Sequence, residues 1–535
     1  MIEKPLFQGV MVRAVAFHAM AAVLLCYVFF GSIWQSSYSM DPHHWGLMLS
    51  NAQDLCNHNL PYQDIFIQYG ILTTAIQGFA FCTLGNNLQS LTLVTAAAYT
   101  LGLYLIYLLG IRLTGKISVS FYALAACVLI HPLIEYPWAN YIAFPFLVLG
   151  LFLLVAAPAR LVPGFLGGVS FGLAILSREG LAPAVMTLIF AMVVADLIRP
   201  TGQRWPAVFR GLILLAGSFL PIGLFFIYLL HHDLLSYWYD LSITLPRIYV
   251  TESFPYMGGV RLLNRFIRWI AEGFISLDPR RVLLLISLLV NALVVVLYLL
   301  GRQREIVRRE FALVAGASLL LVSAALHLPE VFRLATGSAV GFVTLFALLN
   351  RHPLEKVFLS FFLGAMLPTI WSVHIGNRYF PYSAMIANAH AVITPAVFQG
   401  QRWPEANIAY YRNLASDFAE LMEESPCEIK FHYNDTRDAF IAVLSPFKPY
   451  QVAPFVTGNS LNKLRPKLNL FQKLTDGDDI VVLRFTPNGG ESIRTPSRFV
   501  VWKRYPAPAA RYVGNGSDAL EILVPERCVP PALSL

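Results

Sequence analysis

Positive charge is missing from a long stretch near the start of the chain, since no Lys or Arg occurs between Arg13 and Arg112. The stretch is not simply apolar, because a polar segment at 41–70 carries three Asp and three His residues. Loops that stay in the cytoplasm collect Lys and Arg. The lack of cations therefore argues against a cytoplasmic loop and predicts that segment 41–70 is translocated across a membrane.

Charge of either sign is scarce in the whole chain. Only 13% of the 535 residues are charged, 57% are hydrophobic, and the mean hydropathy is +0.60. This composition excludes an ordinary soluble protein and predicts a polytopic membrane protein. The net charge of +8 lies mainly in short loops between apolar runs. There it serves orientation and contact with membrane lipid, and it indicates no nucleic-acid partner.

Cysteine is also rare, and its spacing excludes two kinds of site. The six cysteines contain no CxxC pair, so neither a zinc site nor a disulfide framework is indicated. The first apolar run is not followed by an A-x-A-like cleavage site. We therefore interpret it as a retained first span and not as a removable signal peptide.

Long apolar runs, in contrast, are abundant. About 20 apolar residues cross a bilayer as a helix. We predict about eleven such spans, at 14–34, 89–111, 117–134, 141–158, 162–177, 180–198, 208–230, 281–300, 311–327, 335–350 and 356–375. A further apolar run at 66–84 decides the orientation of the chain. We interpret it as a re-entrant or interfacial piece, because Arg112 and Lys116 then fall in the cytoplasm.

The remaining cations agree with this orientation. The cytoplasmic loops become 156–163, 198–210, 301–310 and 350–356, and the third of them carries four Arg residues. We therefore expect a cytoplasmic N-terminus and an extracytoplasmic C-terminus. One outer loop, 231–280, holds five Arg residues against the rule. Its sequence RLLNRFIRWI is typical of a basic amphipathic helix on the membrane surface.

Beyond Gly376 the composition changes, which predicts two domains. A membrane module covers 1–376, with a first outer loop at 35–88, and a soluble α/β domain covers 377–535. The second domain is expected to contain a helix at 405–425 and strands in CEIKFHY, DDIVVLRF and SRFVVWKRY. If this domain is extracytoplasmic, Cys427 and Cys528 lie in an oxidising compartment, and a disulfide between them is a hypothesis.

Within the first outer loop, the residues after Asp41 favour a helix. A side-chain oxygen of Asp41 can cap the helix, and Pro42 suits the first helical position. Apolar residues then recur at intervals of three and four up to Cys56, which predicts an amphipathic helix in the headgroup zone. Asp41 has two open roles at this point: a helix cap, or a carboxylate for acid/base chemistry.

The arrangement resembles the GT-C superfamily of membrane glycosyltransferases, which includes protein O-mannosyltransferases and the aminoarabinose transferases of lipid A. The resemblance covers the first 200 residues best. It is carried by Asp41 in DPHHWG, by PYQDIFIQYG, by Glu135 in IEYPWANY, and by Ser177-Arg178-Glu179 inside an apolar run. It implies transfer of a sugar from a polyprenyl-phosphate donor to a glycan, lipid or protein acceptor, at the outer face of a bacterial inner membrane.

The resemblance also implies roles for individual residues. Asp41 is the expected catalytic base, and Glu135 is the second acidic residue that such enzymes carry near this point. Asp64 either orients substrate or closes a turn on its own backbone. His43 and His44 are expected to bind the donor phosphate or to contact lipid headgroups.

The other expected contacts have open alternatives too. Arg178 suits phosphate binding through its planar fork, or else pairs with Glu179. Arg333 and Arg378 are further candidates for phosphate binding. Tyr62, Gln68 and Tyr69 fit sugar or lipid contacts and equally fit an interfacial aromatic belt.

No cofactor is expected. Asp54 and His58 have the i,i+4 spacing of a chelating pair, but two ligands make a poor site, and a divalent metal is not favoured. Two other functions stay open. A lipid-linked glycan polymerase or ligase would use the Arg-bearing loop 231–280, whereas a transporter would show two related halves. The sequence specifies neither the sugar, the acceptor nor the anomeric outcome.

Overall fold

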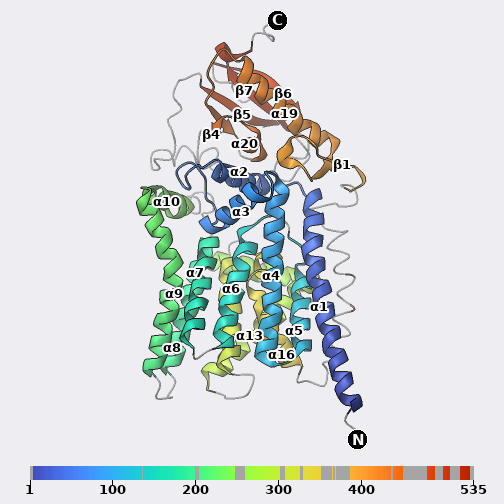
Figure 1. The fold of residues 1–535 in the computed structure, drawn as a ribbon, viewed down its shortest axis with the longest axis vertical. Coiled ribbons are helices and arrows are strands. Elements are labelled where there is room, and N and C mark those ends of the chain that lie inside the picture. The colour runs from blue at the N-terminus through green and yellow to red at the C-terminus, as the bar shows by residue number, and fades with distance from the viewer. Residues whose placement is uncertain are drawn as a thin grey trace.

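A bundle of apolar helices carries an α/β region at one end (Figure 1). The computed structural model describes residues 4–134, 136–157, 160–198, 204–247, 259–276, 278–301, 308–325, 329–350, 386–434, 438–449, 479–487, 498–506 and 518–530, together with Gly364 and Pro368. The prediction of a polytopic helical membrane protein with a C-terminal α/β region is confirmed. Apart from Gly364 and Pro368, the predicted span at 356–375 lies outside the described residues, as does the domain boundary at 376.

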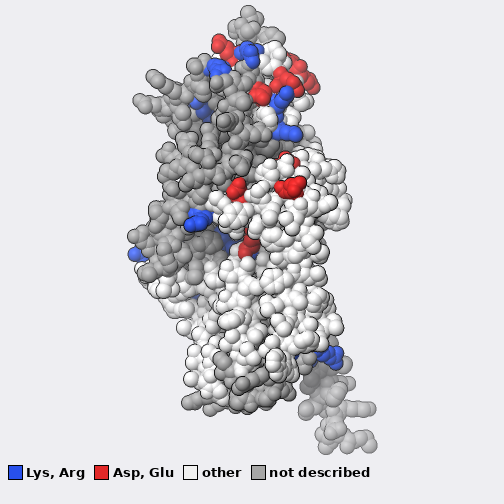
Figure 2. Space-filling model, turned by 90° about the vertical axis from the view of Figure 1, so that its left-hand side faces the viewer, with Lys and Arg blue, Asp and Glu red and all other residues white. Residues whose placement is uncertain are grey.

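Five of the described helices are long and apolar enough to cross a bilayer. They are α1 (Lys4–Tyr38), α4 (Leu88–Thr114), α6 (Ala139–Ala156), α9 (Arg204–His231) and α13 (Pro279–Leu299). Shorter helices complete the bundle: α5 (Ile117–Ile130), α7 (Leu161–Ser177), α8 (Ala182–Ile198), α14 (Arg309–Leu321), α15 (Val331–Ala335) and α16 (Phe342–Leu349). On the face drawn in Figure 2, the described part of the bundle shows few charged side chains, whereas the α/β region shows many.

Local sequence sets the ends and the packing of these helices. Asn87 caps α4 by accepting the Ser90 N–H at 3.2 Å, and Gly115 ends it in the left-handed conformation that glycine allows. Helices α7 and α9 approach closely because Gly168 has no side chain. A Cβ there would overlap the backbone oxygen of Leu214. Such small residues let membrane helices pack without a gap.

Two short helices lie between the bundle and the α/β region (Figure 1). The predicted helix after Asp41 is present as α2 (His44–Cys56), and α3 (Ile71–Leu84) occupies the run expected to be re-entrant or interfacial. The 14 residues of α3 extend about 21 Å, which is less than the roughly 30 Å of bilayer hydrocarbon. Helix α2 is buried on more than the predicted face, because α20 (Phe440–Leu444) packs against Gly46.

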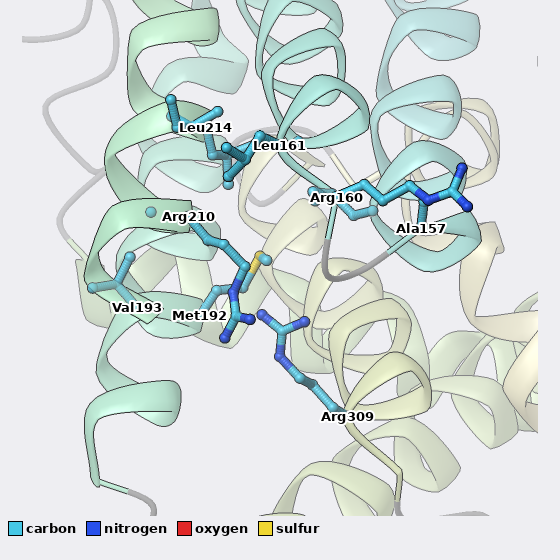
Figure 3. Close-up of a pocket in the computed structure, with 12 residues that line it drawn as sticks. Ala157, Arg160, Leu161, Met192, Val193, Arg210, Leu214 and Arg309 are labelled. Carbon is cyan, nitrogen blue, oxygen red and sulfur yellow. The ribbon is translucent and has the colours of Figure 1, made fainter. Parts of the chain in front are cut away.

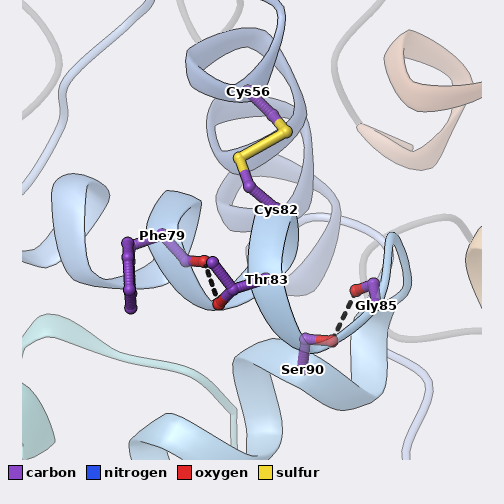
Figure 4. Close-up of a disulfide and its surroundings, with 6 residues drawn as sticks. All are labelled: Cys56, Phe79, Cys82, Thr83, Gly85 and Ser90. Carbon is purple, nitrogen blue, oxygen red and sulfur yellow. Dashed lines mark hydrogen bonds between the residues drawn. A yellow bond between two sulfur atoms is a disulfide. The ribbon is translucent and has the colours of Figure 1, made fainter.

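Two disulfides occur at this end of the molecule, which corrects the expectation that cysteine spacing indicates no disulfide framework. Cys56 of α2 bonds Cys82 of α3, with Cα atoms 5.7 Å apart (Figure 4). The hypothesis for Cys427 and Cys528 is confirmed by their bond, with Cα atoms 5.0 Å apart. Sequence spacing missed the first pair because α2 and α3 come together only in the tertiary structure.

The α/β region contains a five-stranded mixed sheet in the order β4-β3-β5-β7-β6. The strands are β3 (Phe431–Asn434), β4 (Lys448–Pro449), β5 (Ile480–Pro487), β6 (Phe499–Pro506) and β7 (Asp518–Pro525). The predicted helix is confirmed as α19 (Glu405–Glu424), and the three predicted strands as β3, β5 and β6. Outside this sheet, β1 (Ala389–Ala391) pairs with β2 (Arg402–Pro404).

The described parts of the Arg-bearing loop 231–280 include three helical pieces: α10 (Leu235–Tyr239), the π-helical turn η2 (Asp240–Thr244) and α12 (Gly259–Ile275). The predicted amphipathic helix is present as α12. Its apolar side chains Leu263 and Ile267 are exposed, as expected of a helix lying on a membrane surface.

Candidate functional site

The carboxylate of Asp41 is fully buried where the chain passes from α1 to α2. Its Oδ1 accepts the backbone N–H of His44 at 3.0 Å, and its Oδ2 lies 2.8 Å from the His44 Nδ1. One oxygen therefore caps the helix while the other engages an imidazole. The two roles that the sequence left open for Asp41 are compatible in this geometry.

Aromatic rings enclose the imidazole of His44. It stacks on Tyr136 with ring centroids 4.7 Å apart, and it lies 4.8 Å from the ring of Trp138. The ring of Trp138 in turn packs against that of Tyr69, with centroids 4.4 Å apart. These contacts bring the start of α2, the 136–138 turn and the end of the 60–70 loop into one cluster, which fixes His44 against Asp41.

Two buried arginines lie beside the same cluster. Arg178, which ends α7, is 8% exposed, and Arg333 of α15 is 7% exposed. The Arg333 guanidinium lies 5.2 Å from the Trp138 ring, and its Nε donates to Glu330 at 3.0 Å. Burial, followed by the nearby charge of Arg333, lowers the pKa of Arg178. A guanidinium keeps its proton in proteins, so two such neighbours are suited to hold an anion.

Glu179 engages a different set of partners from Arg178. Its Oε1 accepts from the hydroxyls of Tyr62 and Ser242, each at 3.4 Å. Burial raises the pKa of Glu179. Tyr62 is itself fully buried and has a φ of 69°, a conformation that is rare for a bulky residue. Glu179 therefore connects Tyr62 of the 60–70 loop with Ser242 of η2.

The other predicted site residues lie as follows. Asp64 is exposed, and its Oδ2 accepts the Leu60 N–H at 2.9 Å, which is the turn that the sequence left as its alternative. Gln68 is exposed. The centroid of the His43 ring lies 4.8 Å from that of His44. Glu135 and Arg378 lie outside the described residues.

Sequence reasoning missed the two aromatic residues that surround His44. Tyr136 and Trp138 stand in the run IEYPWANY, which was singled out only for its acidic residue. Two large aromatics around a proline at the end of a span were the signal that could have identified them. The same pattern is also typical of an aromatic belt at the membrane interface. Only the contacts of Tyr136 with His44 and of Trp138 with Arg333 indicate that these residues belong to the site.

The α/β region holds the backbone on both sides of Asp41. The indole N–H of Trp403 donates to the carbonyl oxygen of Ser39 at 3.3 Å. On the other side, the N–H of Ala439 donates to the carbonyl oxygen of Pro42 at 3.1 Å. The segment that carries the buried carboxylate is thus clamped between the bundle and the C-terminal region.

A buried acid next to this contact predicts a pH dependence. Asp438 is fully buried, accepts the Tyr411 hydroxyl at 2.9 Å, and has its pKa raised by burial to about 7. In the unfolded chain the carboxyl titrates near its usual pKa of about 4. The folded state thus holds more protons between about pH 4 and pH 7, and stability falls over that window by up to about 1.4 kcal/mol per pH unit.

We therefore expect the full chain to unfold at a lower temperature at pH 8 than at pH 5. In the variant Asp438→Asn, the amide oxygen can still accept the Phe440 N–H, and the amide nitrogen can donate to the Tyr411 hydroxyl. This side chain cannot ionise, so the variant should lose most of the pH difference. Thermal unfolding of wild type and variant across pH 4–8 measures the effect. If the unfolding temperatures of the two proteins changed equally with pH, the expectation would be wrong.

Comparisons with known proteins find structural similarity at low sequence identity. An oligosaccharyltransferase, AglB from Archaeoglobus fulgidus, in complex with an inhibitory peptide and a dolichol-phosphate, is 13% identical, with a TM-score of 0.42 over 88% of this chain and 69% of that one. ArnT from Cupriavidus metallidurans, bound to undecaprenyl phosphate, is 11% identical, with a TM-score of 0.43 over 95% of this chain and 97% of that one.

No family model and no curated protein matches the sequence. The chain is structurally similar to these two proteins at low sequence identity. A functional assignment has to come from the residues of the site itself.

Proposed function

We propose that the chain is a glycosyltransferase that moves a sugar from a polyprenyl-phosphate donor to an acceptor at the outer face of the membrane. The observation that carries the proposal is the buried Asp41–His44 pair, 2.8 Å apart, beside the buried cations Arg178 and Arg333. This arrangement provides a base and an anion site at one place.

The chemistry needs both parts. The acceptor hydroxyl must lose a proton as its oxygen bonds the anomeric carbon, while the bond from that carbon to the phosphate oxygen breaks. Asp41, oriented by His44, is the proposed base that takes the proton. Arg178 and Arg333 are proposed to stabilise the charge that develops on the departing phosphate. We place Tyr69, which contacts Trp138, on the wall of the sugar site.

The proposal also requires this end of the bundle to face outward. Disulfides form in oxidising compartments, and both disulfides lie at the end that carries Asp41. Cations collect on cytoplasmic loops, and Arg160 and Arg210 lie near the start of α7 and in the first turns of α9, at the other end. We therefore propose a cytoplasmic N-terminus and an extracytoplasmic C-terminal region.

Labelling of single cysteines tests this orientation. In a Cys26→Ala background, Gln68→Cys should react with a membrane-impermeant maleimide in intact cells, since Gln68 is exposed. Arg160→Cys, also at an exposed position, should react only after permeabilisation. The reverse labelling pattern would place Asp41 in the cytoplasm and would exclude sugar transfer at the outer face.

The activity itself is tested with the purified chain and lipid-linked sugars extracted from its own membranes. Wild-type protein should convert polyprenyl-phosphate sugar to polyprenyl phosphate in the presence of a membrane acceptor fraction, as followed by chromatography of the labelled lipid. The decisive comparison is between wild-type protein and a variant of Asp41, which should lose this conversion.

A further inference from the structure

One short segment at the start of α3 is bonded to the backbone on both sides of Arg178. Before Arg178, the carbonyl oxygen of Ser177 accepts the Thr73 hydroxyl at 2.7 Å. After Arg178, the Glu179 N–H donates to the carbonyl oxygen of Tyr69 at 3.3 Å. Both neighbours of Arg178 are therefore held by a segment that lies far earlier in the chain.

Gly70 allows this segment, 69–73, to approach the end of α7. A Cβ at Gly70 would lie 2.5 Å from the carbonyl oxygen of Leu176 and 2.6 Å from that of Ser177. These backbone atoms cannot turn aside as the end of a flexible side chain could. Gly70 also has a φ of 146°, which residues with a side chain rarely adopt. Gly70 closes the motif PYQDIFIQYG, so the motif has a structural reason to end in glycine.

The contact to Ser177 is shielded from water. Thr73 is 1% exposed, and Ser177 is fully buried. Buried polar groups are held by the partners that they have, because water cannot replace a lost hydrogen bond there. Arg178 itself has an extended backbone, with φ −151° and ψ 99°, so α7 does not continue through it. The starting point and direction of the Arg178 side chain therefore depend on segment 69–73.

The rest of α3 contacts two other parts of the candidate site. The side chain of Gln77 is buried, and its Nε2 donates at 2.7 Å to the carbonyl oxygen of Pro137, next to Trp138. Near its end, α3 is joined to α2 by the bond between Cys82 and Cys56 (Figure 4). One helix thus connects the end of α7, the turn before α6 and α2.

From these contacts we propose that Gly70 and Thr73 are positioning residues, which place Arg178 to bind the phosphate of the lipid donor. The inference rests on the proposed function, because that function assigns Arg178 to the phosphate. Neither positioning residue touches the phosphate, since both act through the backbone at Ser177. The outer loop that begins at Asp41 therefore also assembles the anion site, so one continuous segment places both the base and the phosphate-binding group.

Binding of farnesyl phosphate, a short prenyl phosphate, to the purified full chain tests the proposal. Thr73→Val keeps the shape of the side chain and removes its hydroxyl. We expect its affinity to fall about tenfold or more, the size of weakening one charge-assisted contact. Thr73→Ser restores the hydroxyl and should recover most of the affinity. Gly70→Ala should also weaken binding, because its methyl group displaces the backbone at Ser177.

The chain offers a matched control for each change. Thr83→Val removes the same group from the same helix, but Thr83 is exposed and donates only to the Phe79 carbonyl oxygen one turn earlier. Gly115→Ala introduces a side chain at a φ of 68°, where no atom lies within 4 Å of the new Cβ. Both controls should bind farnesyl phosphate as the wild-type chain does.

Double variants distinguish positioning of Arg178 from a general loss of structure. In an Arg178→Gln background, Thr73→Val should cause no further loss of affinity, because its effect passes through Arg178. In an Arg333→Gln background, Thr73→Val should still cause its full loss. Equal losses in both backgrounds would show that Thr73 does not act through Arg178, and the proposal would be wrong.

Wild-type affinity in Thr73→Val would also overturn the proposal. If Gly70→Ala fails to fold, the Thr73 variants still decide the outcome. If the wild-type chain itself does not bind farnesyl phosphate, the anion site of the proposed function is wrong, and this inference is wrong with it. If the wild-type chain binds and the Thr73 variants bind equally well, only the positioning role is wrong.

Discussion

Replacing Asp41 by Asn is expected to reduce sugar transfer by roughly 10²- to 10⁴-fold, the usual contribution of a positioned general base. The amide oxygen can still accept the His44 N–H that Oδ1 accepts now, so the start of α2 and the amount of folded protein should be unchanged. The variant loses the ability to take a proton, and the amide nitrogen in place of Oδ2 can only donate to the His44 Nδ1. Initial rates of release of polyprenyl phosphate by the purified variant measure this effect.

The chain offers a matched control in the same outer loop. Asp64→Asn also removes one carboxylate, but Asp64 is exposed and closes a turn on Leu60. We expect this variant to keep most of the activity. If Asp41→Asn transfers sugar at the wild-type rate, the base lies elsewhere. If Asp64→Asn is the inactive variant instead, Asp64 has the substrate-orienting role that the sequence left open.

The second large effect is expected at the buried arginines. Arg178→Gln should slow transfer by about 10²- to 10³-fold, the size typical of losing one donor that stabilises developing charge. The same change at Arg333 should have a smaller effect, since Arg333 also pairs with Glu330. The effect should appear in kcat more than in donor KM, because the charge on the phosphate grows as the bond breaks.

A Lys variant distinguishes the effect of the positive charge of Arg178 from that of its planar geometry. Arg178→Lys keeps the charge but not the planar fork, so it should recover part of the lost rate. Arg412→Gln is the control, because Arg412 is an exposed residue of α19 with a long 3.9 Å contact to Glu405. A purely structural role for Arg178 would lower protein yield and leave kcat unchanged in the protein that remains folded.

Features set by local or average properties were predictable from the sequence. The bundle follows from apolar runs, α2 from its three- and four-residue spacing, and the bond between Cys427 and Cys528 from their shared domain. The α3 segment forms a short helix, which agrees with the interpretation of 66–84 as a re-entrant or interfacial piece that the distribution of cations favoured. These signals depend on local spacing or on the average composition and charge of long segments, and not on particular tertiary contacts.

Features set by tertiary contacts were not predictable. The clustering of His44 with Trp138 and Arg333 joins residues from three distant parts of the chain. Likewise, nothing local indicates that Arg210 and Arg309 line the same hollow at the other end of the bundle (Figure 3). Strand β7 was missed because its short run ALEILV carries no alternation of polar and apolar residues.

The clamp on both sides of Asp41 has a consequence for biosynthesis. Trp403 and Ala439 hold the backbone at Ser39 and Pro42, yet they are made some 360 to 400 residues later. At roughly 5–20 residues per second, this delay lasts from about 20 seconds to more than a minute. A nascent chain whose first helices are already inserted still lacks these contacts until residues up to Ala439 have been made. We therefore expect the segment around Asp41 to reach its final arrangement late in synthesis.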